Sequence, residues 1–375
     1  MRILFVTAHA HMPQMVGGSQ SSTHELALHL AGKGHAVAVL SALWGQGWIG
    51  WRGRIQMKLL RRKVAHDTLL GYDCFRKWRV WEDVEAVTDR FSPDVAVVMA
   101  MNPVPSARAL IAAGIPTAVY FRDVDFDKLG GDPRELDGAV FVANSEFTAA
   151  RFAEAFGLDC VVVPPLFDPS RYRTERTEGG RVTFINPHPL KGSPLAFAIA
   201  ERCPQIPFQF VESWPLDETA RAEIEARTRG TNVTFLRRTS DMKTIYAQTR
   251  ILLAPSRWEE AWGRVATEAQ FSGIPVVASD IGGLPEAVGP GGILVSPDAP
   301  ADAWAAALTR LWEDRAYYAD LSAAALRHSE RPALDADTQA ATLIAHFKRA
   351  VAGGSALARA PVDRASGIAS VQAGR

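Results

Sequence analysis

The feature that most constrains this fold is a repeated alternation of short apolar, β-branched runs with helix-like segments. The first six runs cover 3–7, 35–40, 94–100, 116–121, 138–143 and 160–164. The alternation begins again at 181–186 and continues through 207–212, 232–237, 250–256, 274–279 and 291–296. Strands that are apolar throughout and separated by helices are typical of parallel sheets buried on both faces. We therefore expect an α/β protein with two doubly wound, Rossmann-like domains that face each other across a cleft.

The same pattern gives the domain boundaries. We expect a first domain over 1–165, a linker rich in Pro, Arg, Thr and Gly over 166–180, and a second domain over 181–330. A C-terminal helix over 331–352 could pack back on the first domain. Residues 353–375 contain few large apolar residues and are expected to form a mobile tail. Helices of the first domain are expected near 20–31, 104–113 and 145–156, the last beginning after Ser145 and ending at Gly157.

Composition excludes several classes of protein. Hydrophobic residues make up 47% and charged residues 22%, which excludes a mainly disordered chain. The 41 basic and 41 acidic residues balance, so no overall field favours nucleic acid, and we expect no nucleic-acid partner. Three scattered cysteines fit a reducing compartment and lack metal-ligand spacing. The apolar start predicts a buried strand rather than a signal peptide, and no run is long enough to span a membrane, so we expect a cytoplasmic protein.

Two short motifs follow the first strand of each domain. Gly17 and Gly18 precede a helix, where their backbone amides could approach an anion, although a simple turn would explain them equally well. Lys191 and Gly192 follow the first strand of the second domain. A lysine there could neutralise a phosphate in the cleft, or it could be an ordinary solvated lysine.

A richer segment covers residues 253–279. Its strand ends at Ser256, an acidic loop follows, and a helix begins near Gly263. We expect the backbone N–H groups of Gly263, Arg264 and Val265 to face the cleft. Glu260 in the loop and Glu268 on the helix are too far apart for a close acid/base pair, so each would contact a different part of an extended ligand.

In their order and spacing, these motifs resemble the family 4 retaining glycosyltransferases of the GT-B fold, over roughly residues 1–350. Further matching segments are Gly34–Val37, Asn144–Thr148, Val163–Pro165, Gly273–Ser279 and Gly282–Glu286. The resemblance implies transfer of a sugar from a UDP-sugar or GDP-sugar to an unidentified acceptor, with no further cofactor. Stabilisation of the negative charge on the departing diphosphate would accelerate the transfer, so no strong general base would be required.

The resemblance also implies roles for single residues. Gly18 and Lys191 would hold the diphosphate, and Gly17 would also bind the donor. The amides of Gly263, Arg264 and Val265 would lie beside the phosphates and the sugar. Glu268 would bind the ribose hydroxyls and Glu260 the transferred sugar. Members of this family mostly need no metal for this step. An Asp-x-Asp string at Asp123–Asp125 occurs in the first domain, away from the expected diphosphate.

The chain departs from the family pattern at two positions. Asn186 stands where the family usually has a diphosphate-binding arginine, and Arg257, Arg264 or Arg237 could compensate. Arg122 stands near the position of a family histidine beside the sugar. It could serve the reaction in that place, or it could pair with Asp123 or Asp125 for structural reasons.

Three alternatives remain open for function. A sugar-nucleotide epimerase or a disaccharide phosphorylase could use the same architecture. A non-catalytic nucleotide-sugar-binding protein is the alternative from another class, because Asn186 carries no charge.

One segment lies outside these motifs. No Asp or Glu occurs from Leu26 to His66, while basic residues and tryptophans alternate between Trp44 and Lys63. Such a stretch could lie on an anionic membrane or close over an acidic acceptor. Alternatively, it could be a mobile, solvated insertion whose tryptophans pack on the first domain.

Overall fold

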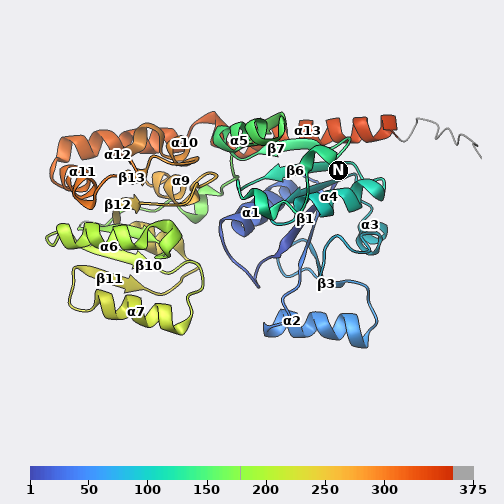
Figure 1. Ribbon diagram of the computed structural model, residues 1–375, viewed down its shortest axis with the longest axis horizontal. Helices are drawn as coiled ribbons and strands as arrows, with labels where there is room; N and C mark the ends of the chain where they lie inside the picture. Colours follow the sequence, from blue (N-terminus) through green and yellow to red (C-terminus); the bar gives the residue numbers. More distant parts are fainter. Residues whose placement is uncertain (178, 358–375) are drawn as a thin grey trace, which may run out of the picture.

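The computed structural model describes residues 1–177 and 179–357, which form two parallel β-sheets lying side by side, each covered by helices (Figure 1). The expected fold class, two doubly wound α/β domains, is confirmed. Residues 353–357, assigned above to a tail, continue the last helix, and the rest of that expected tail lies outside the described residues.

The first sheet has eight strands in the order β3-β4-β2-β1-β5-β6-β7-β8, all parallel except β3, which runs antiparallel to β4. The strands are β1 Arg2–Ala10, β2 Ala36–Ala42, β3 Ala65–Asp67, β4 Asp73–Lys77, β5 Val95–Met99, β6 Thr117–Phe121, β7 Val140–Ala143 and β8 Cys160–Val162. The helices are α1 Gly18–Gly32, α2 Gly47–Arg54, α3 Glu85–Phe91, α4 Pro103–Ala112 and α5 Glu146–Phe156. A π-helical turn over Ile55–Leu59 extends α2.

The second sheet has six parallel strands in the order β11-β10-β9-β12-β13-β14. The strands are β9 Arg181–Ile185, β10 Phe208–Val211, β11 Val233–Leu236, β12 Thr249–Ala254, β13 Val276–Ser279 and β14 Gly292–Val295. The helices are α6 Ser193–Arg202, α7 Glu218–Thr228, α8 Met242–Ala247, α9 Arg264–Gln270, α10 Leu284–Val288, α11 Ala301–Glu313, α12 Arg315–Ser329 and α13 Ala336–Leu357.

Buried apolar side chains hold each sheet between its two layers of helices. In β1, alternate residues face opposite sides, so Ile3 and Phe5 belong to one core while Leu4 and Val6 belong to the other. Helix α13 follows the second domain in sequence but contributes Phe347 to the core of the first. Figure 1 shows α13 running along the first domain. The chain therefore crosses between the domains twice.

Local capping chemistry explains where α5 begins and ends. The Ser145 hydroxyl accepts a hydrogen bond from the Thr148 N–H, and Gly157 adopts a left-handed conformation at φ 66°. Both ends were predicted from the sequence. The strands β3 and β4 and the helices α2 and α3 were not predicted.

The strand order of each sheet indicates where a ligand would bind. In each sheet the order reverses beside the first strand, between β1 and β5 and between β9 and β12. Ligands of doubly wound sheets bind outside the carboxyl ends of the strands at such a reversal. The loops after β1, β9 and β12 carry the glycine, lysine and glutamate motifs of the sequence.

Candidate active site

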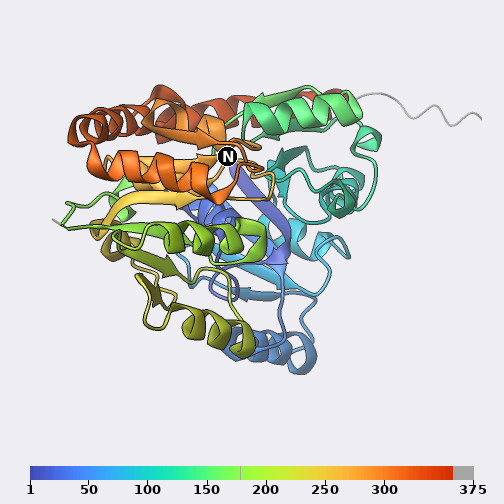
Figure 2. The same cartoon turned by 60° about the vertical axis from the view of Figure 1, so that its left-hand side comes forward.

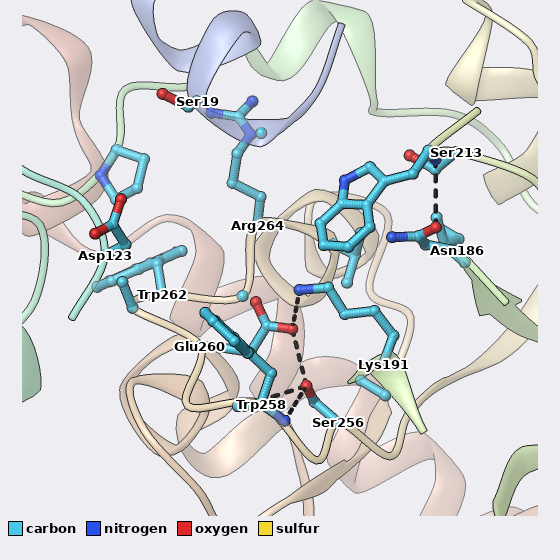
Figure 3. Close-up of a pocket in the computed structure, with 18 of the residues that line it drawn as sticks. Ser19, Asp123, Asn186, Lys191, Ser213, Ser256, Trp258, Glu260, Trp262 and Arg264 are labelled. Carbon is cyan, nitrogen blue, oxygen red and sulfur yellow. Dashed lines mark hydrogen bonds and ion pairs between the residues drawn. The ribbon is translucent and has the colours of Figure 1, made fainter. Parts of the chain in front are cut away.

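A cavity of about 290 Å³ lies between the two domains at these reversal points (Figure 3). The first domain contributes Gly18, Ser19, Ser22, Arg122, Asp123, Asn144 and its last residue, Pro165. The second contributes, among others, Asn186, Lys191, Ser213, Trp214, Ser256, Trp258, Glu260, Trp262, Gly263, Arg264 and Val265. The structure thus brings together most of the site residues expected from the sequence.

Lys191 and Glu260 form an ion pair on one wall of this cavity. The Lys191 Nζ lies 2.5 Å from the Glu260 Oε1, which also accepts a hydrogen bond from the Ser256 hydroxyl at 3.1 Å. Figure 3 shows the two side chains pointing toward each other. Both are about four-fifths buried. The pair places one positive and one negative group at the same point of the cavity wall.

Gly192 explains why a Lys-Gly pair is needed at this point. Its φ of 83° lies in the left-handed region, and a Cβ there would come 1.8 Å from the Pro255 carbonyl oxygen. Glycine therefore lets the loop after β9 touch the loop after β12. This contact is what brings Lys191 within reach of Glu260.

Glu268 faces a second cavity of about 400 Å³, which adjoins the first. The two cavities share Gly18, Ile185, Ser213, Arg264 and Val265. The Glu268 carboxylate accepts hydrogen bonds from the Arg264 Nε at 3.1 Å and the Tyr246 hydroxyl at 2.8 Å. Burial raises its pKa above the ordinary value of a glutamate. Glu260 and Glu268 thus lie in different compartments of one extended site.

The Arg264 side chain joins the two domains. Its Nη1 donates to the Ser22 hydroxyl at 2.7 Å and its Nη2 to Glu25 on α1 at 3.0 Å. Glu25 is almost fully buried and also accepts a bond from the Tyr172 hydroxyl at 2.5 Å. From the sequence we expect the backbone amide of Arg264 to face the ligand, or its charge to compensate for Asn186. The guanidinium is instead the centre of a buried interdomain network.

A second interdomain contact lies at the start of α5. The Glu286 carboxylate, from the second domain, accepts the Glu146 N–H at 2.9 Å and the Phe147 N–H at 2.7 Å. A carboxylate beside a helix amino end is stabilised by the unpaired N–H groups there. Glu286, the last residue of the segment Gly282–Glu286, therefore has a structural role: it binds the amino end of α5 in the first domain.

Arg122 does not form an ion pair with Asp123 or Asp125, which was the structural alternative left open by the sequence. Its Nη1 donates to the Thr23 hydroxyl at 2.9 Å, and its guanidinium carbon lies 4.3 Å from the centre of the Tyr120 ring. Asp123, in contrast, lines the cavity together with Lys191 and Glu260. Asp123 lies in the first domain, as expected, but it lines the same cavity as the residues expected to hold the donor. Burial raises the Asp123 pKa.

Asn186 has a structural explanation of its own. Its backbone φ is 69°, a left-handed conformation that asparagine tolerates better than arginine does. Its side-chain oxygen accepts the Trp214 N–H at 3.3 Å. Of the three arginines offered as compensation, only Arg264 lines the cavity, because Arg257 bonds to Asp298 and Arg237 to Glu225 at the surface.

Several residues of the site were not predicted. Trp214 stands over Lys191, with the Nζ 5.2 Å from its ring centre, and Arg238 lines the second cavity. Both follow the carboxyl end of a strand, β10 or β11, which is the signal that could have found them. Gly17 lines only the second cavity. Within residues 1–177 and 179–357, no three His, Cys, Asp or Glu side chains form a cluster that could hold a metal.

Two doubly wound domains with a ligand-sized site between them define the GT-B class of fold, and comparison with family models identifies the family. The model described as Glycosyltransferase Family 4 matches residues 16–171, and the model described as Glycosyl transferases group 1 matches residues 192–328. Together they match more than three quarters of the chain. The chain therefore belongs to glycosyltransferase family 4, which confirms the family that the sequence motifs resemble.

Curated relatives share part of the chain. It is 32% identical over 219 residues to a D-inositol 3-phosphate glycosyltransferase of Rhodococcus erythropolis, covering 50% of this chain and 49% of that protein. It is 28% identical over 296 residues to a protein of the same name from Corynebacterium kroppenstedtii, covering 73% of this chain and 59% of that protein. The matches thus span between half and three fifths of these two relatives.

Solved structures share the fold. HepE of Anabaena, solved in complex with UDP and glucose, has a TM-score of 0.71 at 19% identity, over 93% of this chain and 100% of that chain. Sucrose-phosphate synthase of Thermosynechococcus elongatus has a TM-score of 0.70 at 15% identity, over 94% and 100%. At these identities the likeness concerns the fold alone.

Proposed function

We propose that this protein is a retaining glycosyltransferase that moves a sugar from a nucleotide-diphosphate sugar, with UDP or GDP as the nucleotide, to an acceptor held by the first domain. The observation that carries the proposal is the pair of adjoining cavities, with Lys191 and Glu260 in one and Glu268 in the other. Their volumes fall in the range of small-molecule sites, and an extended donor could occupy both.

The donor's parts correspond to the chemistry of the two cavities. Glu268 would accept hydrogen bonds from ribose hydroxyls, and Lys191 would neutralise the diphosphate. Glu260 would accept hydrogen bonds from hydroxyls of the transferred sugar. Family membership and the UDP complexes of the similarly folded Anabaena protein support this assignment.

In the proposed reaction, the bond between the anomeric carbon and the diphosphate breaks while the acceptor oxygen attacks the same face. The acceptor proton passes to the departing diphosphate oxygen, so no strong general base is required. The Lys191 ammonium would contribute most as negative charge grows on the leaving group. Asp123 lies across the cavity, on the first domain, where it could hold an acceptor hydroxyl.

Two measurements test the proposal. A thermal-shift screen of UDP, GDP, ADP, TDP and their sugars identifies the donor, because a ligand at 100 times its dissociation constant adds about 2.7 kcal/mol of stability. The best donor is then incubated with an acceptor panel that includes D-inositol 3-phosphate, and free nucleoside diphosphate and product are measured. We expect diphosphate release to require acceptor and to equal the product formed.

The same assay separates the alternatives. Donor binding without turnover under any acceptor would favour a nucleotide-sugar-binding protein. An epimerase would convert the donor without releasing diphosphate, and a phosphorylase would form sugar 1-phosphate from a disaccharide and phosphate. An inverted anomeric centre in the product, seen by nuclear magnetic resonance, would contradict retention.

A further inference from the structure

We propose that the first domain binds an anionic membrane through the surface formed by residues 44–63, here called the tryptophan surface. This segment connects β2 to β3 and contains α2 and the π-helical turn. The donor site contains none of these residues. The proposal therefore goes beyond the proposed function and does not depend on it. Among the described residues, the search for a helix that could cross a bilayer found none.

Large apolar side chains are concentrated on this surface. Twelve large apolar side chains of the described residues are exposed, and five of them lie between residues 44 and 60. The five are Trp44, Trp48, Trp51, Leu59 and Leu60, with exposed fractions of 48%, 59%, 60%, 75% and 55%. Trp78 stands close by, since its ring would touch a Cβ at Gly45. Exposed tryptophan and leucine together are typical of side chains that enter the membrane–water interface.

The packing of α2 explains why its tryptophans face outward. A Cβ at Gly50 would come 2.2 Å from the Trp44 carbonyl oxygen, and one at Gly53 would come 2.8 Å from a Leu43 methyl carbon. The helix therefore lies with its glycine side directly against the preceding segment, and Trp48 and Trp51 remain outside. This contradicts the alternative in which the tryptophans pack on the first domain.

Gln56 fixes the segment to the sheet. Its amide donates to the His66 carbonyl at 3.0 Å and accepts the His66 N–H at 2.8 Å, so it bonds to β3 much as a neighbouring strand would. A fixed surface loses little conformational entropy when it binds, which favours a docking function over a solvated insertion.

The charge of the surface selects an anionic partner. Six basic side chains lie beside the apolar ones, and all six are exposed: Arg52, Arg54, Lys58, Arg61, Arg62 and Lys63. Two acidic residues near the segment have partners outside it, because Asp67 is buried against Arg76 and Asp83 pairs with Lys77. Residues 58–63, Lys-Leu-Leu-Arg-Arg-Lys, are exposed without interruption. Two leucines among four cations suit a lipid surface better than a soluble polyanion, which would leave the leucines in water.

The position of the tryptophan surface is consistent with an enzyme that acts at a membrane. Both ribbon views place α2 at the periphery of the first domain (Figure 1 and Figure 2). The segment leaves the carboxyl end of β2, and β1 and β6 deliver Gly18 and Arg122 from the same edge of that sheet. A membrane bound there would lie on the acceptor side of the cleft.

The test is co-sedimentation of the full chain with vesicles of phosphatidylcholine containing phosphatidylglycerol, compared with vesicles of phosphatidylcholine alone. We expect binding to the anionic vesicles only, and weaker binding as salt rises. Each cation near such a surface contributes roughly fivefold to the partition coefficient. The Arg62→Gln/Lys63→Gln variant should therefore bind at least tenfold more weakly. Trp48→Ser/Trp51→Ser should also bind more weakly, at any salt concentration.

A matched control removes the same charge elsewhere. Arg315→Gln/Arg327→Gln removes two exposed cations from α12 of the second domain and should bind vesicles as the unaltered chain does. Circular dichroism and the thermal midpoint establish that each variant is folded. Equal vesicle binding by the Arg62→Gln/Lys63→Gln variant and the control would overturn the proposal. Retention on heparin by a chain that does not bind anionic vesicles would also overturn the proposal, since that result indicates a soluble anionic partner.

Discussion

Replacing Glu25 by glutamine tests the buried network that joins the two domains. Glu25 lies on α1 and accepts hydrogen bonds from Arg264 Nη2 at 3.0 Å, Arg171 Nη1 at 2.9 Å and the Tyr172 hydroxyl at 2.5 Å. Its side chain is about 1% exposed, so solvent screens these bonds little. Glutamine keeps the shape of the side chain and removes its charge.

The structure sets the size of the effect. Two of the three donors are cationic, and a hydrogen bond to a charged group contributes about 1.5–3 kcal/mol. Glutamine still offers one oxygen, so part of this is retained. Arg264 also keeps Glu268 at 3.1 Å, which avoids the full cost of an unpaired buried charge. We expect Glu25→Gln to lower the free energy of unfolding by about 2–4 kcal/mol, which lowers Tm by roughly 3–5 °C for a protein of this size.

Calorimetry and urea unfolding measure this change. The matched control is Glu82→Gln, which breaks an exposed ion pair with Arg79 at 3.0 Å and should change stability by less than about 0.5 kcal/mol. If Glu25→Gln behaves like this control, the network does not stabilise the interdomain contact and the reasoning from burial is wrong.

Three further predictions concern the site and its surroundings. Lys191→Ala should weaken nucleoside diphosphate binding by about 1.5–3 kcal/mol in calorimetry, whereas Lys348→Ala, on the exposed side of α13, should not. Glu268→Gln should weaken nucleoside diphosphate binding, whereas Glu260→Gln should not weaken it and should lower turnover; equal loss of binding in both variants would contradict the division of roles. Burial lowers the pKa of His11 to about 3, so only the unfolded chain gains its proton as pH falls from about 6.5. Between pH 6.5 and 3, the unaltered chain should therefore lose up to about 1.4 kcal/mol more stability per pH unit than His11→Gln, as urea unfolding of the two proteins would show.

The fold could be predicted because its determinants are local. Apolar runs such as that of β1 are continuous in the sequence, and Ser145 and Gly157 cap α5 through bonds to residues a few positions away. β3 has only three residues and α2 is rich in glycine, so neither has a clear periodic pattern. Short or glycine-rich elements form through tertiary contacts, which one sequence does not display.

The candidate site could be predicted only in part, because its contacts are long-range. Lys191, Glu260 and Glu268 were found from motifs, but the Lys191–Glu260 pair depends on the contact of Gly192 with Pro255. Arg264 meets Glu25 across 239 positions of sequence, and no local pattern connects them. The sequence offers Asp123 only as part of an Asp-x-Asp string in the first domain, and its place in the cavity depends on how the two domains meet. Residues from both domains line the cavity between them.

The Lys191–Glu260 pair also bears on the neutral Asn186. In the structure each member of the pair satisfies the other, so neither is left as an unpaired, largely buried charge. In the proposed reaction, the diphosphate would replace the Glu260 carboxylate as the partner of Lys191, and sugar hydroxyls would replace the ammonium as donors to Glu260. A diphosphate alone would free Glu260 without giving it a donor, so the complete nucleotide sugar should bind more tightly than the nucleoside diphosphate. An arginine at position 186 would add a positive charge whether or not the sugar is present. With asparagine there, a larger share of the binding free energy depends on the sugar. Asn186→Arg would add a similar increment of binding free energy for both ligands, so the nucleotide sugar should keep its advantage over the nucleoside diphosphate in that variant.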